Sequence, residues 1–206
     1  MFNPHYHPTH FAFKLLMMPL IQSLRATLTQ DSARRLLAPN GIQGQLLRWV
    51  RGDIRALADV FIPYRLYKVG IDDRGARTSR YYAIDAASGS LDPYEFSAPP
   101  DLDEVSTRNV INSTVNEITT RERAIEKMRR KLYASGFFRL RNPLITAELV
   151  GQEFYVPYWA GFFGEERHLN VTVADAVRHS VEGAKVRRVI QDWLMGQPGD
   201  ESLPAI

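Results

Sequence analysis

Phe61-Ile62-Pro63-Tyr64 and Tyr155-Val156-Pro157-Tyr158 place nearly the same four residues in two distant parts of the chain. Each stretch is followed by a second run rich in aromatic or β-branched residues, at 81–86 and at 171–176, and both of these runs end in Asp-Ala. Runs of this composition are typical of β-strands. The same order of features in both places predicts an internal repeat built around strands.

The spacing of the landmarks locates the difference between the two copies. Pro63 and Pro157 are 94 residues apart, whereas Asp85 and Asp175 are 90 apart, so the second copy is four residues shorter between these points. Turn-forming residues at 72–75 and 164–167 divide each copy into two strands. We therefore expect a hairpin in each copy, with the length change inside it, where loops accept it most easily.

Helical periodicity surrounds the two hairpins. Apolar residues recur at steps of three and four over 11–29, over 109–133 and over 183–193. The middle segment fits one long helix or two shorter ones. These patterns predict an α+β fold of two similar helix-plus-antiparallel-meander repeats, with an N-terminal and a C-terminal helix.

The expected organisation has five parts, which follow the repeat and a Pro-containing acidic stretch near Pro100. They are an N-terminal arm with helices (1–42), a first α+β repeat (43–98), an acidic connector (99–108), a second repeat with a basic helix and the terminal helix (109–196), and a tail (197–206).

Composition is that of a globular protein, with 45% hydrophobic and 24% charged residues among 206 and a net charge of +3. The absence of cysteine excludes disulfides, thiolate metal sites and thiol catalysis. The start lacks the features of a signal peptide, and the apolar run 11–21 is interrupted by Lys14 and Pro19 and is too short to span a bilayer. We expect a cytoplasmic protein, with peripheral membrane contact left open.

The segment Tyr82-Ala83-Ile84-Asp85-Ala86-Ala87-Ser88-Gly89, preceded by an aromatic strand and a hairpin, resembles PepSY-type domains of the cystatin-like α+β group. Residues 173–179 match the same pattern less well, because His179 stands where the first copy has Gly89. The resemblance covers about half of the chain and transfers no functional residues. It implies a non-catalytic binding or regulatory role.

Four aromatic residues of the repeated strands are candidates for partner binding: Tyr64, Tyr82, Tyr158 and Trp159. The alternative is that they are core residues, since aromatic side chains dominate both cores and interfaces. The sequence leaves this choice open. The leading hypothesis is a subunit or regulator of a larger assembly that binds a protein partner through an exposed sheet face or edge.

A basic stretch supports a second hypothesis. Residues 121–141 contain eight Lys or Arg against two Glu, which would suit nucleic acid or an anionic membrane surface, although such a run is usually a solvated helix face. The candidate anion-binding residues are Arg121, Arg123, Lys127, Arg130 and Lys131.

An enzyme is the third hypothesis. Asp85, Asp175, His168 and His179 could act as acids or bases, but their spacing does not bring them together, and turn capping explains both aspartates more simply. The sequence therefore gives no catalytic residues, and it implies no cofactor. His5, His7 and His10 have a spacing that could bind a transition metal, but no fourth ligand is nearby, and an extended terminal arm is the simpler interpretation.

Overall fold

The computed structural model describes residues 18–38, 52–73, 76–134, 144–164 and 170–196. Within them lies one mixed eight-stranded sheet in the order β4-β3-β2-β6-β1-β5, to which β7 is added through β6 and β8 through β7. The strands are β1 (Leu20–Leu24), β2 (Ile54–Asp73), β3 (Ala76–Asp85), β4 (Tyr94–Phe96), β5 (Leu102–Ser106), β6 (Leu144–Phe163), β7 (Asn170–Asp175) and β8 (Ser180–Val181). The helices are α2 (Gln30–Leu37), α4 (Glu117–Ala134) and α5 (Ala184–Gly196).

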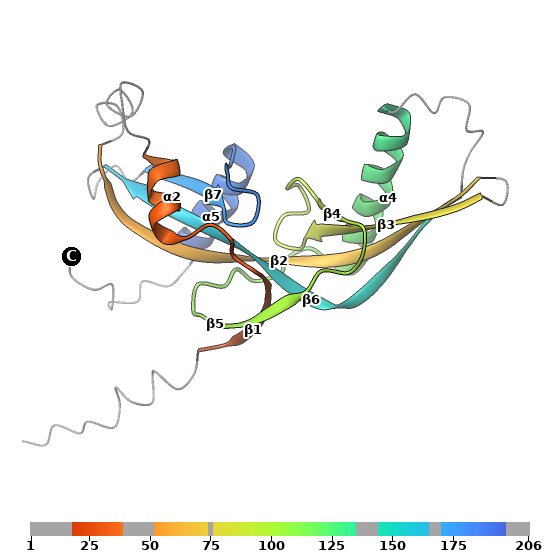
Figure 1. Cartoon of the computed structure of the whole chain (residues 1–206), viewed down its shortest axis with the longest axis horizontal. Helices are drawn as coiled ribbons and strands as arrows, with labels where there is room; N and C mark the ends of the chain where they lie inside the picture. The colour runs from red at the N-terminus through yellow and green to blue at the C-terminus, as the bar shows by residue number, and fades with distance from the viewer. Residues whose placement is uncertain (1–17, 39–51, 74–75, 135–143, 165–169, 197–206) are drawn as a thin grey trace, which may run out of the picture.

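The predicted fold class is wrong, because the two hairpins are not separate helix-plus-meander units. The strands β2 and β6, each 20 residues long, contain the two similar stretches and pair with each other in antiparallel register from Ile54↔Phe163 to Asp72↔Leu144. Both strands cross the molecule from end to end, and α2 and α4 lie over opposite ends of the pair (Figure 1). Strands of both copies therefore belong to one curled, strand-dominated sheet.

The predicted N-terminal helix over 11–29 is also wrong where the structure describes it. Residues 20–24 form β1, which pairs with β5 along its length and meets β6 in parallel at Ser23↔Tyr155. The partner strand β5 falls inside the predicted connector 99–108. The leucines of this segment have helical spacing, but the segment forms a strand because it pairs with β5, some 80 residues later. Local periodicity contains no information about such a distant partner.

Other local predictions are confirmed. The strands on either side of 72–75 form the hairpin β2–β3, and those on either side of 164–167 form the pair β6–β7. The helix predicted at 183–193 is α5, which buries Val186 and Ile190 in the main core. The helical segment 109–133 yields one helix, α4, that begins at Glu117, where the Asn116 side chain accepts a hydrogen bond from the Thr119 N–H at 2.8 Å.

The central strand pair has the register of a two-fold axis. Ile62 pairs with Val156, which is the residue 94 positions later and thus its own counterpart. On either side, Phe61 pairs with Pro157 and Pro63 with Tyr155. The second strand of each hairpin keeps the same relation, since Tyr64 lies opposite Asp85 and Tyr158 opposite Asp175.

The helices α2 and α4 each lie on the hairpin of the other half. The Thr27 and Leu28 N–H groups before α2 donate to the Ala176 carbonyl, at 3.0 and 2.9 Å. The Thr114 and Val115 N–H groups before α4 donate to the Ala86 carbonyl, both at 2.9 Å. The segment before each of these two helices is thus bonded to the end of the hairpin in the other half, and the two halves exchange these segments.

The result is two wings that extend from the central pair. The long wing consists of residues 64–73 of β2, β3, residues 144–150 of β6, and α4, whose Ala124 and Met128 pack on Tyr67 and Tyr82. The short wing consists of residues 54–60 of β2, residues 158–163 of β6, β7, and α2, whose Ala33 and Leu37 pack on Phe163 and Ala174.

Candidate functional site

A buried cluster of hydroxyl groups lies where the wings meet. The Tyr64 and Tyr158 hydroxyls are 3.0 Å apart, and the Tyr94 hydroxyl donates to Oδ2 of Asp175. The rings of Tyr64 and Tyr94 meet edge to face, with centroids 5.5 Å apart. The Arg178 guanidinium covers the outer face of the Tyr94 ring, 3.7 Å from its centroid.

This cluster is structural. Burial raises the pKa values of Tyr64, Tyr94 and Tyr158 above the ordinary value, and the neighbouring Asp175 raises that of Tyr94 further, so these phenols remain neutral donors. Tyr64 is fully buried and Tyr158 nearly so. The question left open by the sequence is answered for this pair: their rings belong to the core and present no surface to a partner.

The other two aromatic candidates are also occupied within the fold. Tyr82 is buried under α4, where its hydroxyl contacts the sulfur of Met128 at 3.9 Å. Trp159 is half-buried, and its indole N–H donates to the Leu28 carbonyl at 2.8 Å. Tyr82 therefore holds α4 against the sheet, and Trp159 holds the segment that leads into α2.

The first aspartate turn closes the long wing near the centre. Oδ1 of the buried Asp85 accepts hydrogen bonds from the Ser88 and Gly89 N–H groups at 2.5 and 2.9 Å, and Oδ2 accepts one from the Leu91 N–H at 2.8 Å. These three bonds satisfy a carboxylate that has no access to solvent. Asp85 therefore shapes the turn and is not available as a catalytic base.

The second aspartate turn repeats the arrangement. Oδ1 of the buried Asp175 accepts hydrogen bonds from the Val177 and Arg178 N–H groups at 2.8 and 2.7 Å. His179 adopts a left-handed conformation with φ of 57°, as Gly89 does in the first turn with φ of 66°. The histidine thus keeps the turn, and its Nε2 lies 2.7 Å from the Thr27 hydroxyl.

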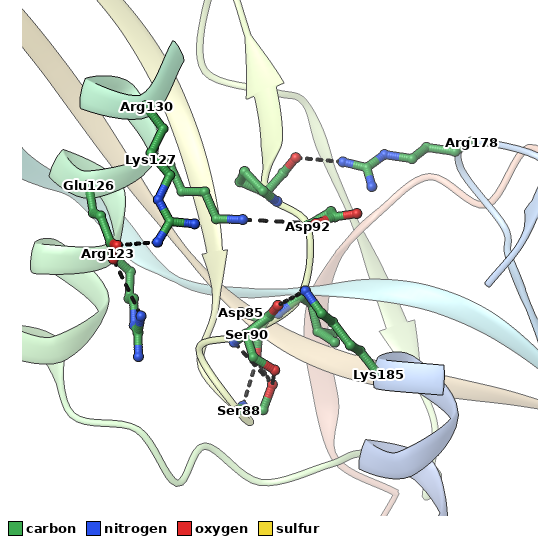
Figure 2. A network of polar contacts seen from close by, with 12 residues as sticks. Asp85, Ser88, Ser90, Asp92, Arg123, Glu126, Lys127, Arg130, Arg178 and Lys185 are labelled. Atoms are coloured by element: carbon green, nitrogen blue, oxygen red, sulfur yellow. Dashed lines mark hydrogen bonds and ion pairs between the residues drawn. The ribbon is translucent and has the colours of Figure 1, made fainter. Parts of the chain in front are cut away.

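Basic side chains of the second half converge on the loop that follows the first turn (Figure 2). Lys127 lies 3.9 Å from Asp92, Arg178 donates to the Pro93 carbonyl at 2.6 Å, and Lys185 donates to the Ser90 carbonyl at 3.2 Å. These contacts tie the halves together.

The predicted anion-binding residues are all engaged with carboxylates. The ion pairs are Arg121–Glu117 (2.6 Å), Arg123–Glu126 (3.3 Å), Lys127–Asp92 (3.9 Å), Arg130–Glu126 and Lys131–Glu95 (2.5 Å). Most of these side chains are exposed, so the individual pairs contribute little to stability. They do reduce the positive field that the sequence of α4 predicts.

Metal and catalytic candidates gain no geometric support. His5, His7, His10 and His168 lie outside the described residues. Among the residues that are described, no three His, Asp or Glu side chains are grouped in a way that could hold a metal ion.

One feature remains exposed and unexplained by packing: the outer edge of β6 in the long wing. Residues 144–150 pair with β2 on one side, whereas β1 and β7 join β6 only farther along, at Tyr155 and from Tyr158 onward. Within the described part of the chain, no strand pairs with the other side of this stretch. Its backbone groups are therefore open to a further strand.

Five of the seven side chains along this edge are apolar. The sequence Leu144-Ile145-Thr146-Ala147-Glu148-Leu149-Val150 has no proline, lysine or arginine, and Leu144 and Leu149 are 66% and 38% exposed. A bulge ends the stretch at Gly151, which has a φ of 68° and shifts the register opposite Arg65. Sequence reasoning missed this site, although it named an exposed edge as a mode of binding.

Comparison with known proteins adds no family. No protein-family model, no curated protein and no solved structure matches the chain. The resemblance to PepSY-type domains therefore stays a prediction. No helix in the described residues has the length and apolar character needed to cross a membrane.

Proposed function

We propose that this chain is a non-catalytic protein-interaction module that binds an extended segment of a protein partner at residues 144–150 of β6. The observation that carries the proposal is a strand edge, seven residues long with exposed Leu144 and Leu149, that pairs with no other strand among the described residues. An edge of this kind accepts another strand through main-chain hydrogen bonds, while alternate side chains supply specificity.

Edges of natural sheets are normally protected, because they otherwise template aggregation. Common protective devices are lysine or proline on the edge, a bulge within it, or a very short strand. Residues 144–150 have none of these, and Glu148 is the one charged residue among them. A strand that remains unprotected over seven residues is best explained by a partner that covers it.

The corresponding edge of the short wing supports this interpretation. We propose that the chain is a duplicated unit whose two strands pair about Ile62 and Val156, so that residues 54–56 of β2 correspond, 94 positions earlier, to residues 148–150 of the exposed edge of β6. That edge carries the exposed Arg55 and a register irregularity at the same residue. The bulge of the long wing lies at Gly151, outside residues 144–150, so this edge has neither a basic residue nor a register irregularity within it.

Nucleic acid or an anionic surface is the less supported alternative. Binding of this kind needs cations that are free to replace counterions on phosphates. Five basic residues of α4 already contact carboxylates. No observation in the structure favours this function over binding at the edge of β6.

Site-specific photo-crosslinking tests the proposal. A photoreactive phenylalanine derivative is incorporated at Leu149 of the full chain, and the protein is irradiated in cells of the organism from which it comes. A matched protein carries the same group at Met195, an apolar side chain of α5 that is 77% exposed and lies on no strand edge. Mass spectrometry of the products identifies the crosslinked chains.

We expect a discrete adduct from position 149 that is absent at position 195 and disappears when Ala147→Lys is added to break strand addition. The same adducts from both positions, or an adduct that survives Ala147→Lys, would contradict the proposal. Circular dichroism of the Ala147→Lys protein, which should retain the wild-type spectrum, confirms that the variant is folded.

A further inference from the structure

The two flanks of α4 differ in chemistry. Lys127 and Lys131 lie on one flank and reach Asp92 and Glu95, which belong to the loop before β4 and to β4 itself. Since the sheet order is β4-β3-β2-β6, the opposite flank of the helix faces the exposed edge of β6.

The flank that faces β6 combines apolar residues with one acid and one base. Residues 118, 122, 125, 129 and 132 share it, because steps of three, four and seven return to the same side of a helix. They are Ile118, Glu122, Ile125, Arg129 and Leu132. Leu132 of this flank packs against the same buried cluster as Ile145 and Ala147 of β6, which agrees with this direction, and Ile118 is 67% exposed.

One face of the β6 edge lies beneath this flank. Ile145, Ala147 and Leu149 alternate along the strand, so they share the face covered by α4, and Thr146 and Glu148 point the other way. Leu149 pairs with Tyr67, whose hydroxyl donates to the Glu117 carbonyl at 3.2 Å, next to Ile118. The exposed side chains of Leu149 and Ile118 therefore lie at the same end of the helix.

Arg129 gives this apolar surface a charge. Every other Arg or Lys of α4 forms an ion pair. Within the described residues, the exposed Arg129 has no carboxylate partner. The acid of this flank, Glu122, lies two helical turns away toward Ile118, so Arg129 places a separate positive charge at the Leu132 end of the flank, beside the β6 edge.

From these observations we infer that the partner segment is an extended strand with apolar residues at alternate positions and an acidic residue that reaches Arg129. Its backbone pairs with residues 144–150, and its apolar side chains contact Leu149 and the apolar flank of α4. The inference rests on the proposed function and specifies the chemistry of the bound segment. It follows from charge complementarity and from the two-residue period of a strand.

A second copy of this chain fits the surface less well. Antiparallel pairing of two such edges places both α4 helices on the same face of the joined sheet, with their Arg129 flanks turned toward each other. Glu148, the acid of this edge, remains on the opposite face in both copies. Self-pairing thus brings two like charges together and provides no carboxylate from either strand.

A phage-displayed library of linear nine-residue peptides, selected on the immobilised full-length chain, tests the inference. Three variants are selected in parallel. Leu149→Lys blocks the edge, Arg129→Glu reverses the charge, and Arg130→Glu serves as the matched control because Arg130 points to Glu126. Fluorescence anisotropy with the enriched peptides measures affinity, and sedimentation velocity of the unliganded proteins measures self-association.

We expect enriched peptides that alternate apolar and polar residues and carry Asp or Glu at one fixed position. Their affinity should fall by roughly tenfold or more in Arg129→Glu, a change of about 1.4 kcal/mol, but little in Arg130→Glu. Selection on Arg129→Glu should instead enrich Lys or Arg at that position. Leu149→Lys should bind none of these peptides.

Three results would overturn the inference. Peptides that require Leu149 but show no acidic preference would reject the charge match while leaving the proposed function intact. A wild-type dimer that Leu149→Lys dissociates would make a second copy the occupant. Enrichment only of peptides that bind Leu149→Lys equally well, together with no crosslink at position 149, would reject the inference and the proposed function together.

Discussion

The two wings perform the same structural task with different side chains at equivalent positions. Tyr67 in the long wing corresponds to Gly161 in the short wing, 94 residues later. The ring of Tyr67 fills the space under α4, and its hydroxyl lies 2.6 Å from that of Thr120. At Gly161 no ring intervenes, and a Cβ there would lie 3.0 Å from a methyl carbon of Leu37 in α2. The short helix therefore lies closer to its sheet than a side chain would permit.

A second pair of equivalent residues, Arg65 and Trp159, has the same hydrogen-bonding role in the two wings. Arg65 donates to the Val115 carbonyl at 2.6 Å, and its counterpart Trp159 donates to the Leu28 carbonyl at 2.8 Å. Both acceptors lie in the segment that enters a helix from the other half. A guanidinium and an indole have little in common except that both are planar groups with an N–H donor. The two wings thus share this hydrogen bond, although they differ in charge and length.

The largest effect is expected at the two aspartate turns, which the wings share. Asp175→Ala should lower the free energy of unfolding by about 3–5 kcal/mol, because it leaves two backbone N–H groups and the Tyr94 hydroxyl without a buried acceptor. Asp85→Ala should cost about as much, since three N–H groups lose their acceptor. Denaturant unfolding measures both, and a loss under about 1 kcal/mol would show that the turns do not depend on these carboxylates.

Alkaline pH should weaken the junction between the wings. The pKa values of Tyr64, Tyr94 and Tyr158 are raised in the folded protein, so above about pH 10 the unfolded chain loses protons that the folded chain retains. Stability is then full below about pH 10 and falls above it, by roughly 1.4 kcal/mol per pH unit for each tyrosine.

Urea unfolding at a series of pH values measures this slope. Tyr64→Phe should reduce it by about one tyrosine's share, and Tyr133→Phe, at an exposed position of α4, is the matched control. Equal slopes in all three proteins would show that the buried hydroxyls do not control the alkaline limit.

The contrast between Tyr67 and Gly161 predicts a smaller effect. Gly161→Ala should destabilise the protein by about 1–2 kcal/mol, because the new methyl group meets Leu37 and Phe163 at 3.0 and 3.2 Å. Gly161→Ala combined with Leu37→Val should recover part of this loss, because the shorter side chain makes room. Thermal unfolding of the single and double variants measures the coupling, and additive losses would contradict a direct clash.

The smallest effect concerns the left-handed residue of each turn. Gly89→Ala should cost about 1 kcal/mol, because φ at this position is 66°. His179→Gly should change stability by less than about 1 kcal/mol, since relief of backbone strain is offset by the added freedom of glycine and the lost contact with Thr27. Thermal unfolding separates the two cases, and a large loss in His179→Gly would show that the imidazole contact dominates.

The sequence predicts the local parts of this fold well. Composition and turn residues locate both hairpins. The segment Pro157–Asp175 is four residues shorter than Pro63–Asp85, and this difference correctly places the length change within the hairpins β2–β3 and β6–β7. The aspartate turns follow from the side-chain chemistry of Asp and from Gly89. Each of these features depends on residues close together in the chain.

The remaining features depend on pairings that a single sequence does not specify. Nothing local shows that β2 pairs with its own counterpart, and this pairing converts two units into one sheet. The strand β1 reads as a helix until β5 is known to lie beside it. The exposed edge of β6 has the same cause, because Leu144 and Leu149 look like ordinary strand residues and only the sheet order reveals that one side is open.

The exchange of the segments before α2 and α4 has a consequence for synthesis on the ribosome. Thr27 and Leu28 bind the Ala176 carbonyl, so α2 waits for nearly the last hairpin before it gains its contacts, whereas β1 finds its partner β5 once residue 106 has been made. The first hairpin likewise stays uncovered until α4 has emerged. We expect nascent chains stalled after residue 134 to be cleaved by protease within α2, and those stalled beyond the C-terminus by an added linker to resist. Protection of α2 from protease in the shorter chains would contradict the expectation that α2 packs only after the second hairpin has been synthesised.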